Sequence, residues 1–303
     1  MIDTMETLSA SAEGRVVALG NFDGVHVGHQ ALLAEAGRLG ETLSLPVAVW
    51  SFASLPDETL TTPEGRAAYL HAYGADEVIY DVFERVRDFT PERFFREVLV
   101  EALNAKACVC GFNYSFGQDG AGHAATLEAL CREAGILCRV VSEVALDGEA
   151  VSSTRIRTLL REGQVEGAAR LLGHPYALTG RVESGRHFGR TMGLPTLNQR
   201  FGEGICLPRR GVYATFCRVN GAIYPSVTNI GCCPTVTEGR ETVVETHILD
   251  FQGELYGEEV EVGFLRWLRE ERKFSSVEAL KEEIEENCRM ARGIFLSSFP
   301  AEW

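Results

Sequence analysis

The chain has 303 residues, of which 45% are hydrophobic and 24% are charged, as in an ordinary globular protein. This length exceeds the usual size of one hydrophobic core, and two domains of roughly 100 to 200 residues each are expected. The formal net charge of −14 excludes a general nucleic-acid surface, because phosphate backbones need clustered Lys and Arg. A P-loop is excluded as well, since no lysine follows a glycine-rich segment; the lysines are Lys106, Lys273 and Lys281.

The cysteine pattern indicates a reducing compartment. The nine cysteines show no C-x-x-C spacing. The N-terminus has no signal pattern, and no apolar run reaches the roughly 18 residues of a membrane span. We therefore expect a cytoplasmic protein without disulfides and without a membrane partner. Cys232 and Cys233 are adjacent but have no His or Cys partners at metal-ligand spacing, so we interpret them as structural.

The first half is predicted to be a parallel α/β domain, because short apolar runs alternate with helix-length segments from Arg15 to about Leu172. Residues 62–64 and 90–92 mark two helix starts, each with a Thr cap, a Pro and an acid. Ligands collect beyond the carboxyl ends of such strands, where the loops 20–29, 111–122 and 151–157 should converge. The predicted strands are 15–19, 47–52, 77–82, 107–110 and 137–142.

Beyond Tyr176, short alternating runs broken by Gly and Pro predict a small antiparallel β-barrel or sandwich. The domain boundary is expected near 173–176, where Gly-His-Pro interrupts a helical pattern. One helix over 275–291 should close the domain, starting from a capping box of Ser275 and Glu278. Its apolar positions at helical spacing are Val277, Leu280, Ile284 and Met290, and the predicted strands are 177–182, 211–219, 223–227, 243–249 and 259–264.

The segment LGNFDGVHVGH, residues 19–29, follows the first predicted strand and opens a helix. A helix start offers unpaired backbone N–H groups and a partial positive charge, so His26 and His29 add donors where a phosphate chain would lie. An H-x-G-H pattern alone is a weak signal, because a helix start tolerates His and Gly for structural reasons. Its place after a strand favours nucleotide chemistry.

Two further segments should reach the same cleft. Residues 151–157, VSSTRIR, alternate hydroxyls and guanidiniums before a helix and offer donors to phosphate oxygens; a cap explains Ser153 but not both arginines. Residues 111–117, GFNYSFG, bring aromatics and an amide to the end of a buried strand. A tight turn with core Phe residues explains that segment equally well.

With all three segments in this order, residues 15–172 resemble the FAD synthetase module of bacterial bifunctional riboflavin kinase/FAD synthetases, a member of the HxGH nucleotidyltransferase group. The resemblance implies a Rossmann-like domain that binds ATP, in which the FMN phosphate attacks the α-phosphorus. That phosphate is already anionic, so positioning and charge stabilisation suffice without a general base. His26 and His29 are the implied catalytic residues, with Asn113 at the flavin. The implied nucleotide-binding residues are Gly20, Asn21, Phe22, Asp23, Gly28, Ser153, Thr154, Arg155 and Arg157.

Two segments depart from that family. Where the family usually has F-x-P-H-P, this chain reads FASLP at 52–56, so Leu55 replaces a polar ring. The loop that usually carries Lys or Arg reads FGQDGAG at 116–122, which removes positive charge and adds a carboxylate. We expect slower adenylylation than in a typical relative, and pyrophosphate release at an ordinary rate would refute this.

In the second half, residues 185–198 place Gly185, Gly189 and Gly193 before the Pro-Thr-x-Asn unit that ends at Asn198. Glycine permits close backbone approach to phosphates. Thr196 and Asn198 lie on one face if the segment is extended, and they supply neutral oxygens for a Mg²⁺ that carries phosphate oxygens. A surface hairpin is the alternative for this segment alone.

Together with residues 229–235, 245–251 and 255–257, this segment repeats the motif order of riboflavin kinases, and the match runs from about Leu178 to Arg292. The resemblance implies that Glu245 is the base for the ribityl 5′-hydroxyl, a neutral alcohol that needs help losing its proton. It also places Arg269 at the flavin, although that segment reads equally as a solvated charge run. The family often has an acid near Asn287, and Trp267 reads as a core residue.

The sequence therefore predicts a cytoplasmic enzyme with an FAD synthetase domain over 1–174 and a riboflavin kinase domain over 175–303. Riboflavin, FMN and ATP are the expected substrates, FAD a product and Mg²⁺ the cofactor. No nucleic-acid or membrane partner is expected, and the oligomeric state is open. One alternative is a riboflavin kinase whose first domain binds nucleotide or flavin without catalysis. Another is nucleotide transfer to a different phosphate ester.

Overall fold

The computed structural model describes residues 2–5, 13–55, 58–183, 196–234 and 240–299. By its internal contacts the chain forms two compact units, Met1–Ser153 and Thr154–Trp303. Helices α6 (Ser153–Arg161) and α7 (Val165–Leu172) lie before the predicted boundary at 174/175, yet most of their residues cluster with the second unit. The functional boundary at 174/175 stays a prediction.

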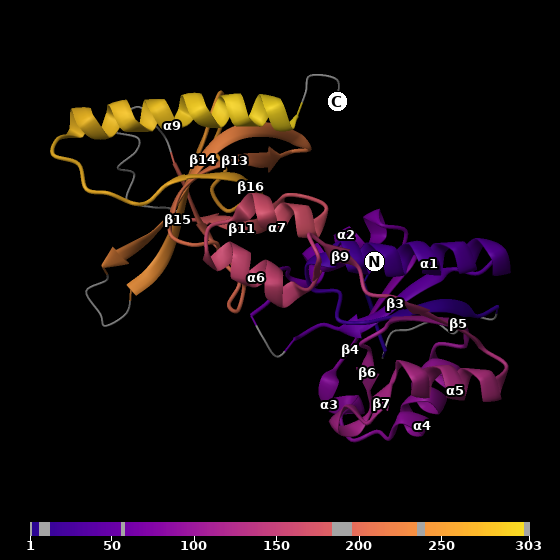
Figure 1. The fold of residues 1–303 in the computed structure, drawn as a ribbon. Helices are drawn as coiled ribbons and strands as arrows, with labels where there is room; N and C mark the ends of the chain where they lie inside the picture. Colours follow the sequence, from indigo (N-terminus) through magenta and orange to yellow (C-terminus); the bar gives the residue numbers. More distant parts are fainter. Residues whose placement is uncertain (1, 6–12, 56–57, 184–195, 235–239, 300–303) are drawn as a thin grey trace. The chain divides into compact units, whose positions relative to one another are not determined.

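The first unit contains a six-stranded parallel sheet in the order β1-β4-β3-β2-β5-β8 (Figure 1). All five strands predicted in this half are present, and β1 was not predicted. Strand β2 lies between β3 and β5 in this sheet. The chain continues from β2 to β3 on one side and later adds β5 on the other side, so the strand order reverses at β2. Ligands bind at such a reversal point, beyond the carboxyl ends of the strands. The strands are β1 (Ile2–Thr4), β2 (Arg15–Leu19), β3 (Val47–Phe52), β4 (Glu77–Asp81), β5 (Ala105–Gly111) and β8 (Leu137–Val141).

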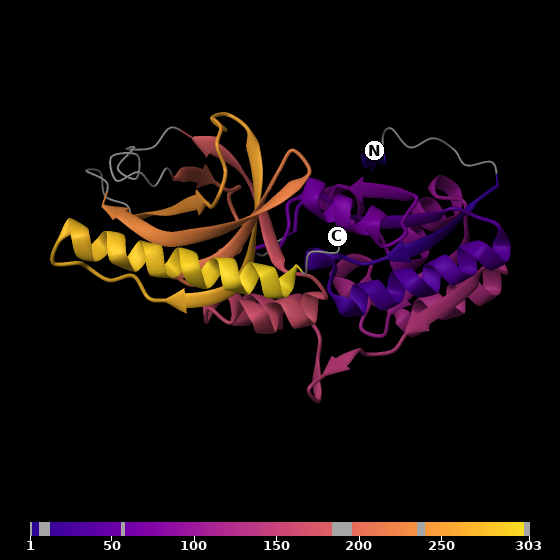
Figure 2. The same cartoon turned by 90° about the horizontal axis from the view of Figure 1, so that it is seen from above.

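Helices cover both faces of this sheet, which explains its runs of consecutive apolar residues (Figures 1 and 2). Val16 and Ala18 of β2 face α1 (Val27–Leu43) and α2 (Pro63–Ala72). Val17 and Leu19 face the other layer. That layer consists of α3 (Phe83–Val86), α4 (Pro91–Phe94), the π-helical turn η2 (Phe95–Ala102) and α5 (Ala124–Ala134). The smaller elements are η1 (Asp23–Val25), η3 (Gln118–Gly120) and the hairpins β6/β7 (Ser115–Phe116, Gly122–His123) and β9/β10 (Ala145–Leu146, Glu149–Ala150).

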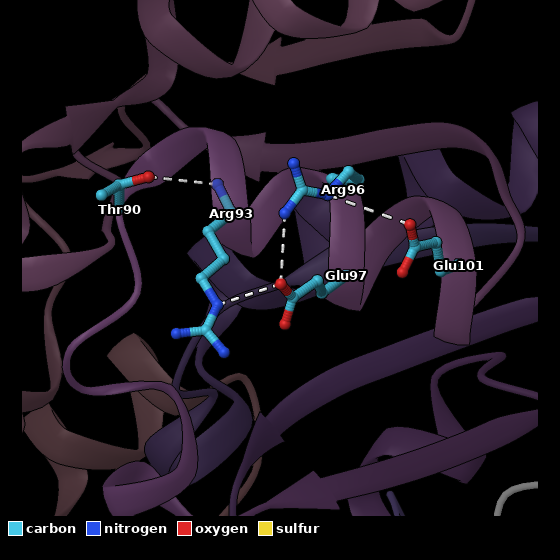
Figure 3. A network of polar contacts seen from close by, with 5 residues as sticks. All are labelled: Thr90, Arg93, Arg96, Glu97 and Glu101. Atoms are coloured by element: carbon cyan, nitrogen blue, oxygen red, sulfur yellow. Dashed lines mark hydrogen bonds and ion pairs between the residues drawn. The ribbon is translucent and has the colours of Figure 1, made fainter.

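Both predicted helix starts of this unit are confirmed. The Thr62 hydroxyl accepts the backbone N–H of Gly65 at 3.1 Å at the start of α2. The Thr90 hydroxyl accepts the N–H of Arg93 at 3.2 Å at the start of α4 (Figure 3). Figure 3 also shows ion pairs that link Arg93 and Arg96 to carboxylates further along the helix, including Arg93–Glu97 at 3.0 Å. Because these pairs are exposed to water, they stabilise the helix little, and the cap and the apolar face contribute more to it.

The second unit is a closed antiparallel barrel in the order β11-β12-β15-β14-β13-β16, which confirms the predicted fold class. Its interior carries a chain of buried hydroxyls in which Thr215 bonds to Thr228 at 2.8 Å and Thr228 bonds to Thr246 at 3.0 Å. Because Thr228 and Thr246 point inward, their neighbours Asn229 and Glu245 face the outside of the barrel. The strands are β11 (Tyr176–Glu183), β12 (Leu197–Arg200), β13 (Gly211–Val219), β14 (Ala222–Pro234), β15 (Arg240–Ile248) and β16 (Glu259–Arg269).

Helix α9 (Val277–Ser298) packs on β13 and β14 and closes the barrel unit (Figure 2). The predicted capping box at Ser275 is wrong by one residue, since the Ser276 side chain accepts the N–H of Ala279 at 3.1 Å. The predicted apolar stripe is also partly wrong, because Val277 and Met290 are exposed. The helix instead buries Asn287 and Ala291 against the barrel.

Candidate active sites

The loop after β2 holds the two motif histidines in a fixed stack. His26 caps α1, where its Nδ1 accepts the backbone N–H of His29 at 3.3 Å. The two imidazole rings lie 3.6 Å apart between centroids and 14° from parallel. The packing around the stack is tight, because a Cβ on Gly28 would lie 3.2 Å from the His26 ring and a Cβ on Gly20 3.2 Å from the Phe22 ring.

Both histidines are neutral at pH 7. Burial lowers the pKa of His26 to about 4. The pKa of His29 also falls well below 6.5, first because of burial and then because of the charges of His26 and Arg66. Since His26 Nδ1 accepts a hydrogen bond, its ring proton sits on Nε2 and remains available to a ligand. The pair therefore offers neutral donors at a helix N-terminus, a place that favours an anion.

The residues between β2 and His26 shape this loop. Phe22 has φ 53° and its buried ring lies 5.1 Å from the His29 ring between centroids. Asp23 is buried, and its Oδ1 accepts the backbone N–H of Leu60 at 2.8 Å. Asn21 has an exposed side chain, while its carbonyl accepts from Ser51 Oγ at 3.1 Å. Phe22 and Asp23 thus hold the loop, and their contact with a nucleotide stays a prediction.

Ser153 is the residue of segment 151–157 that contacts the histidine loop within the first unit. Its Oγ donates to the carbonyl of Asp23 at 2.9 Å. Thr154, Arg155 and Arg157 belong to the second unit, where Arg157 Nη2 donates to Thr154 Oγ1 at 3.4 Å. Their approach to the phosphates stays a prediction. The segment after β5 leaves Asn113 exposed, next to the exposed ring of Phe112.

Sequence reasoning missed two residues near these strand ends. The guanidinium of Arg66 is buried beneath the loops that follow β2 and β3. The exposed ring of Phe83 stands 5.5 Å from Phe52 between centroids, nearly edge-on. An arginine in a helix, such as Arg66, and an apolar residue after a strand, such as Phe83, are common in any globular protein. Neither residue could therefore be recognised as functional from the sequence.

The second site is a cavity of about 340 Å³ in the barrel unit. It lies between the outer face of the barrel and α9, which contributes Leu280, Ile284 and Asn287. Val212, Val227 and Phe274 add apolar surface. The polar lining consists of Thr196, Asn229, Glu245, His247, Arg269, Glu271 and Arg272.

Glu245 stands in the middle of a three-strand register, paired with Asn198 on β12 and with Asn229 on β14. Its side chain is open to solvent on the cavity side. Partial desolvation and then the nearby Glu271 raise the pKa of Glu245, which strengthens it as a base. Glu271, which the sequence did not single out, accepts from Asn229 Nδ2 at 3.5 Å.

Oxygen donors suited to Mg²⁺ lie next to this carboxylate. Thr196 lines the cavity, and Asn198 follows on the same face of β12. Within the described ranges, no three His, Cys, Asp or Glu side chains are grouped so that they could hold a metal ion. Thr196 and Asn198 supply neutral side-chain oxygens, which suit a magnesium ion that also carries substrate phosphates. Gly185, Gly189 and Gly193 lie outside the described residues.

Arg269 lines the same cavity, at the end of β16 rather than in a free charge run. Its Nε lies 2.8 Å from Glu283 and donates to Asn287 Oδ1 at 3.4 Å. Phe274 lies under its guanidinium at 5.6 Å from the ring centroid. Where the family often has an acid, Asn287 thus holds the arginine side chain, with Glu283 supplying the charge.

Comparison with known proteins identifies both units. The riboflavin kinase family profile matches residues 172–295 and the FAD synthetase profile matches residues 8–155. A bifunctional riboflavin kinase/FMN adenylyltransferase of Listeria monocytogenes is 36% identical over 93% of this chain and 92% of its own length. The chain belongs to the bifunctional riboflavin kinase/FMN adenylyltransferase family. It is therefore an enzyme of flavin biosynthesis, as the sequence predicted.

Other relatives agree with this family. The bifunctional riboflavin kinase/FMN adenylyltransferases of Bacillus subtilis and Escherichia coli K12 are 36% and 34% identical, over 91% and 96% of this chain and the same shares of their own lengths. A crystal structure described as a macrolide-efflux protein from Streptococcus pneumoniae has the same fold, with a TM-score of 0.86, 31% identity and coverage of 96% of this chain and 97% of that one. Among the described residues of this family member, no helix is long and apolar enough to cross a membrane.

Proposed function

We propose that this chain carries out both reactions of its family, each at one of the two sites described above. The barrel cavity converts riboflavin and ATP to FMN and ADP, and the histidine site converts FMN and ATP to FAD and pyrophosphate. The observation that carries the kinase assignment is the place of Glu245, a basic carboxylate open to the cavity between two amides on neighbouring strands.

In the kinase reaction, Glu245 takes the proton of the ribityl 5′-hydroxyl while that oxygen attacks the γ-phosphorus and ADP leaves. A neutral alcohol needs this help, and a raised pKa brings the base closer to neutral pH. The apolar side chains of Val212, Val227 and Ile284 give the flavin ring a dry wall. Arg269, oriented by Glu283 and Asn287, donates to the ring's polar edge.

Mg²⁺ is the proposed cofactor of the kinase site, held by Thr196 and Asn198 together with the phosphates of ATP. When bound, it neutralises charge on the transferred phosphoryl group and on ADP. Gly185, Gly189 and Gly193 are proposed to approach the ATP phosphates through their backbone.

In the adenylyl transfer, the FMN phosphate attacks the α-phosphorus of ATP and pyrophosphate leaves. His26 and His29 donate hydrogen bonds to the phosphates, and Ser153, Thr154, Arg155 and Arg157 close over them. No base is needed, because the nucleophile is already an anion; the site supplies position and charge stabilisation. Asn113 is proposed to contact the flavin, and Gly20, Asn21, Phe22, Asp23 and Gly28 to form the wall around the phosphates.

We place the enzyme in the cytoplasm with small-molecule partners alone. In the described part of the chain seven cysteines are free thiols: Cys108, Cys110, Cys131, Cys138, Cys206, Cys217 and Cys288. The net charge of −14 opposes binding to nucleic acid.

A time course with riboflavin, ATP and Mg²⁺ tests the proposal, with the flavins separated by chromatography. We expect FMN first and FAD later, and no product after magnesium is removed with a chelator. FMN without FAD would instead support a kinase whose first domain has lost catalysis. Absence of both flavins would reject the kinase assignment, and FAD formation from supplied FMN would then test the first domain separately. If FMN is not adenylylated, other phosphorylated acceptors test transfer to a different ester.

A further inference from the structure

Arg66 is the fourth residue of α2, yet its side chain is turned away from solvent and the residue is 1% exposed. Arginine on a helix at the protein surface normally keeps its guanidinium in water. Its burial here therefore requires a set of partners.

Those partners are neutral oxygens. Nη1 donates to the carbonyl of Asn21 at 3.0 Å, and Nη2 donates to the carbonyls of Phe52 and Ala53 at 2.7 and 2.9 Å. Nε donates to the hydroxyl of Tyr80 at 3.1 Å, and the Tyr80 ring lies 4.9 Å from the guanidinium carbon. One side chain thus ties the loop after β2 to the end of β3.

Arg66 differs from Arg15, another buried arginine, in having no carboxylate partner within the residues that the structure describes. Arg15 is also buried, at 2% exposure, but its Nε meets the carboxylate of Glu77 at 2.9 Å. Among the described residues, no carboxylate lies within ion-pair distance of Arg66. Asp23, the buried carboxylate of the neighbouring loop, accepts from Leu60 and Thr61. A buried charge without a counter-ion is costly, and selection for stability alone favours pairing it or replacing it.

The Arg66 charge lies where an anion is expected. Asn21 begins the loop that carries the histidines, and the charge of Arg66 contributes to the lowered pKa of His29, after burial and the charge of His26. The loop 116–122, at the other side of the strand reversal, contains no Lys or Arg. Arg66 thus places a positive charge beneath the histidine loop, whereas the 116–122 segment supplies none.

We propose that Arg66 is a positioning residue for adenylyl transfer, whose guanidinium fixes the ends of β2 and β3 and whose charge is balanced by the triphosphate of bound ATP. This inference rests on the proposed adenylyltransferase activity. It assigns to a residue outside the H-x-G-H and S-S-T-R segments a role in ATP affinity.

The test compares Arg66→Met, Arg66→Lys and the matched control Arg15→Met, each in the full chain. For Arg66→Met we expect the KM for ATP in FAD formation to rise at least 10-fold, with riboflavin kinase activity within 2-fold of wild type. Arg66→Lys keeps the charge without the planar fork, and its KM for ATP should lie between those of Met and wild type. Arg15→Met should lower the melting temperature without changing the KM for ATP.

A second readout covers the case in which Arg66→Met fails to fold. In Arg66→Gln the pKa of His29, followed by nuclear magnetic resonance, should rise, because the positive charge that opposes its protonation is removed. An unchanged pKa of His29 in Arg66→Gln, or an unchanged KM for ATP in folded Arg66→Met, overturns the inference. A wild-type chain that makes no FAD rejects the proposed function instead.

Discussion

Replacing Glu245 by Gln removes the proposed base of the kinase reaction with little change in shape. Asn229 keeps its partner, because its amide bonds to Glu271 rather than to Glu245. Loss of a positioned base costs about 10²- to 10⁴-fold in kcat, which corresponds to about 2.7–5.4 kcal/mol of transition-state stabilisation. We expect FMN formation to fall by this factor.

The assay follows FMN formation from riboflavin and ATP by chromatography, with FAD formation from supplied FMN as an internal control. Since the pKa of Glu245 is raised in the folded state, its carboxylate costs free energy on folding at pH 7. The neutral Gln should therefore leave thermal stability at pH 7 unchanged or slightly higher. Glu261→Gln, a carboxylate on β16 paired with Arg218 at 3.0 Å, is the matched control. Kinase activity in Glu245→Gln above a tenth of wild type would refute the reasoning.

Three more variants separate the two sites and the fold. His29→Ala should slow FAD formation by about 10²- to 10³-fold, as for loss of one oxyanion donor, and leave FMN formation intact; His71→Ala is the control, and equal losses in both variants would contradict the assignment. Glu271→Gln should shift the acidic limb of the kinase pH profile to lower pH, because Glu271 contributes to the raised pKa of Glu245; a limb that stays in place would remove Glu271 from that role. Thr228→Val breaks the buried hydroxyl chain and should destabilise the barrel by about 1–3 kcal/mol, measured by thermal unfolding; a higher melting temperature would show that the chain is dispensable.

Strong local patterns predicted most of the fold. The strands of the parallel sheet are buried on both faces and appear as apolar runs, and the Thr-Pro caps mark their helices directly. Strand β12 (Leu197–Arg200) was not predicted, because four residues are too few to show an alternating apolar pattern. Its pairing with β11 and β15 is visible only in the structure. The start of α9 follows two adjacent serines that are equally good caps by residue type, and the structure shows that Ser276 caps the helix.

The candidate sites were predictable where a side chain serves chemistry through a motif, as for His26, His29 and Glu245. They were not predictable where burial depends on distant backbone. In the sequence Arg66 has the pattern of a solvent-exposed helical residue. In the structure it is buried because it donates to the carbonyls of Asn21 and Phe52, which are distant in sequence. Glu271 gains its place beside Glu245 because β14 and β16 both border the cavity, which one segment of sequence does not reveal.

The most direct test of the two-site account follows the phosphates of ATP into the flavins. With riboflavin, Mg²⁺ and ATP labelled at the γ-phosphate, label should enter FMN and remain in FAD. With ATP labelled at the α-phosphate, label should enter FAD and be absent from FMN. Label from the α-phosphate in FMN, or FAD that lacks it, would contradict the account.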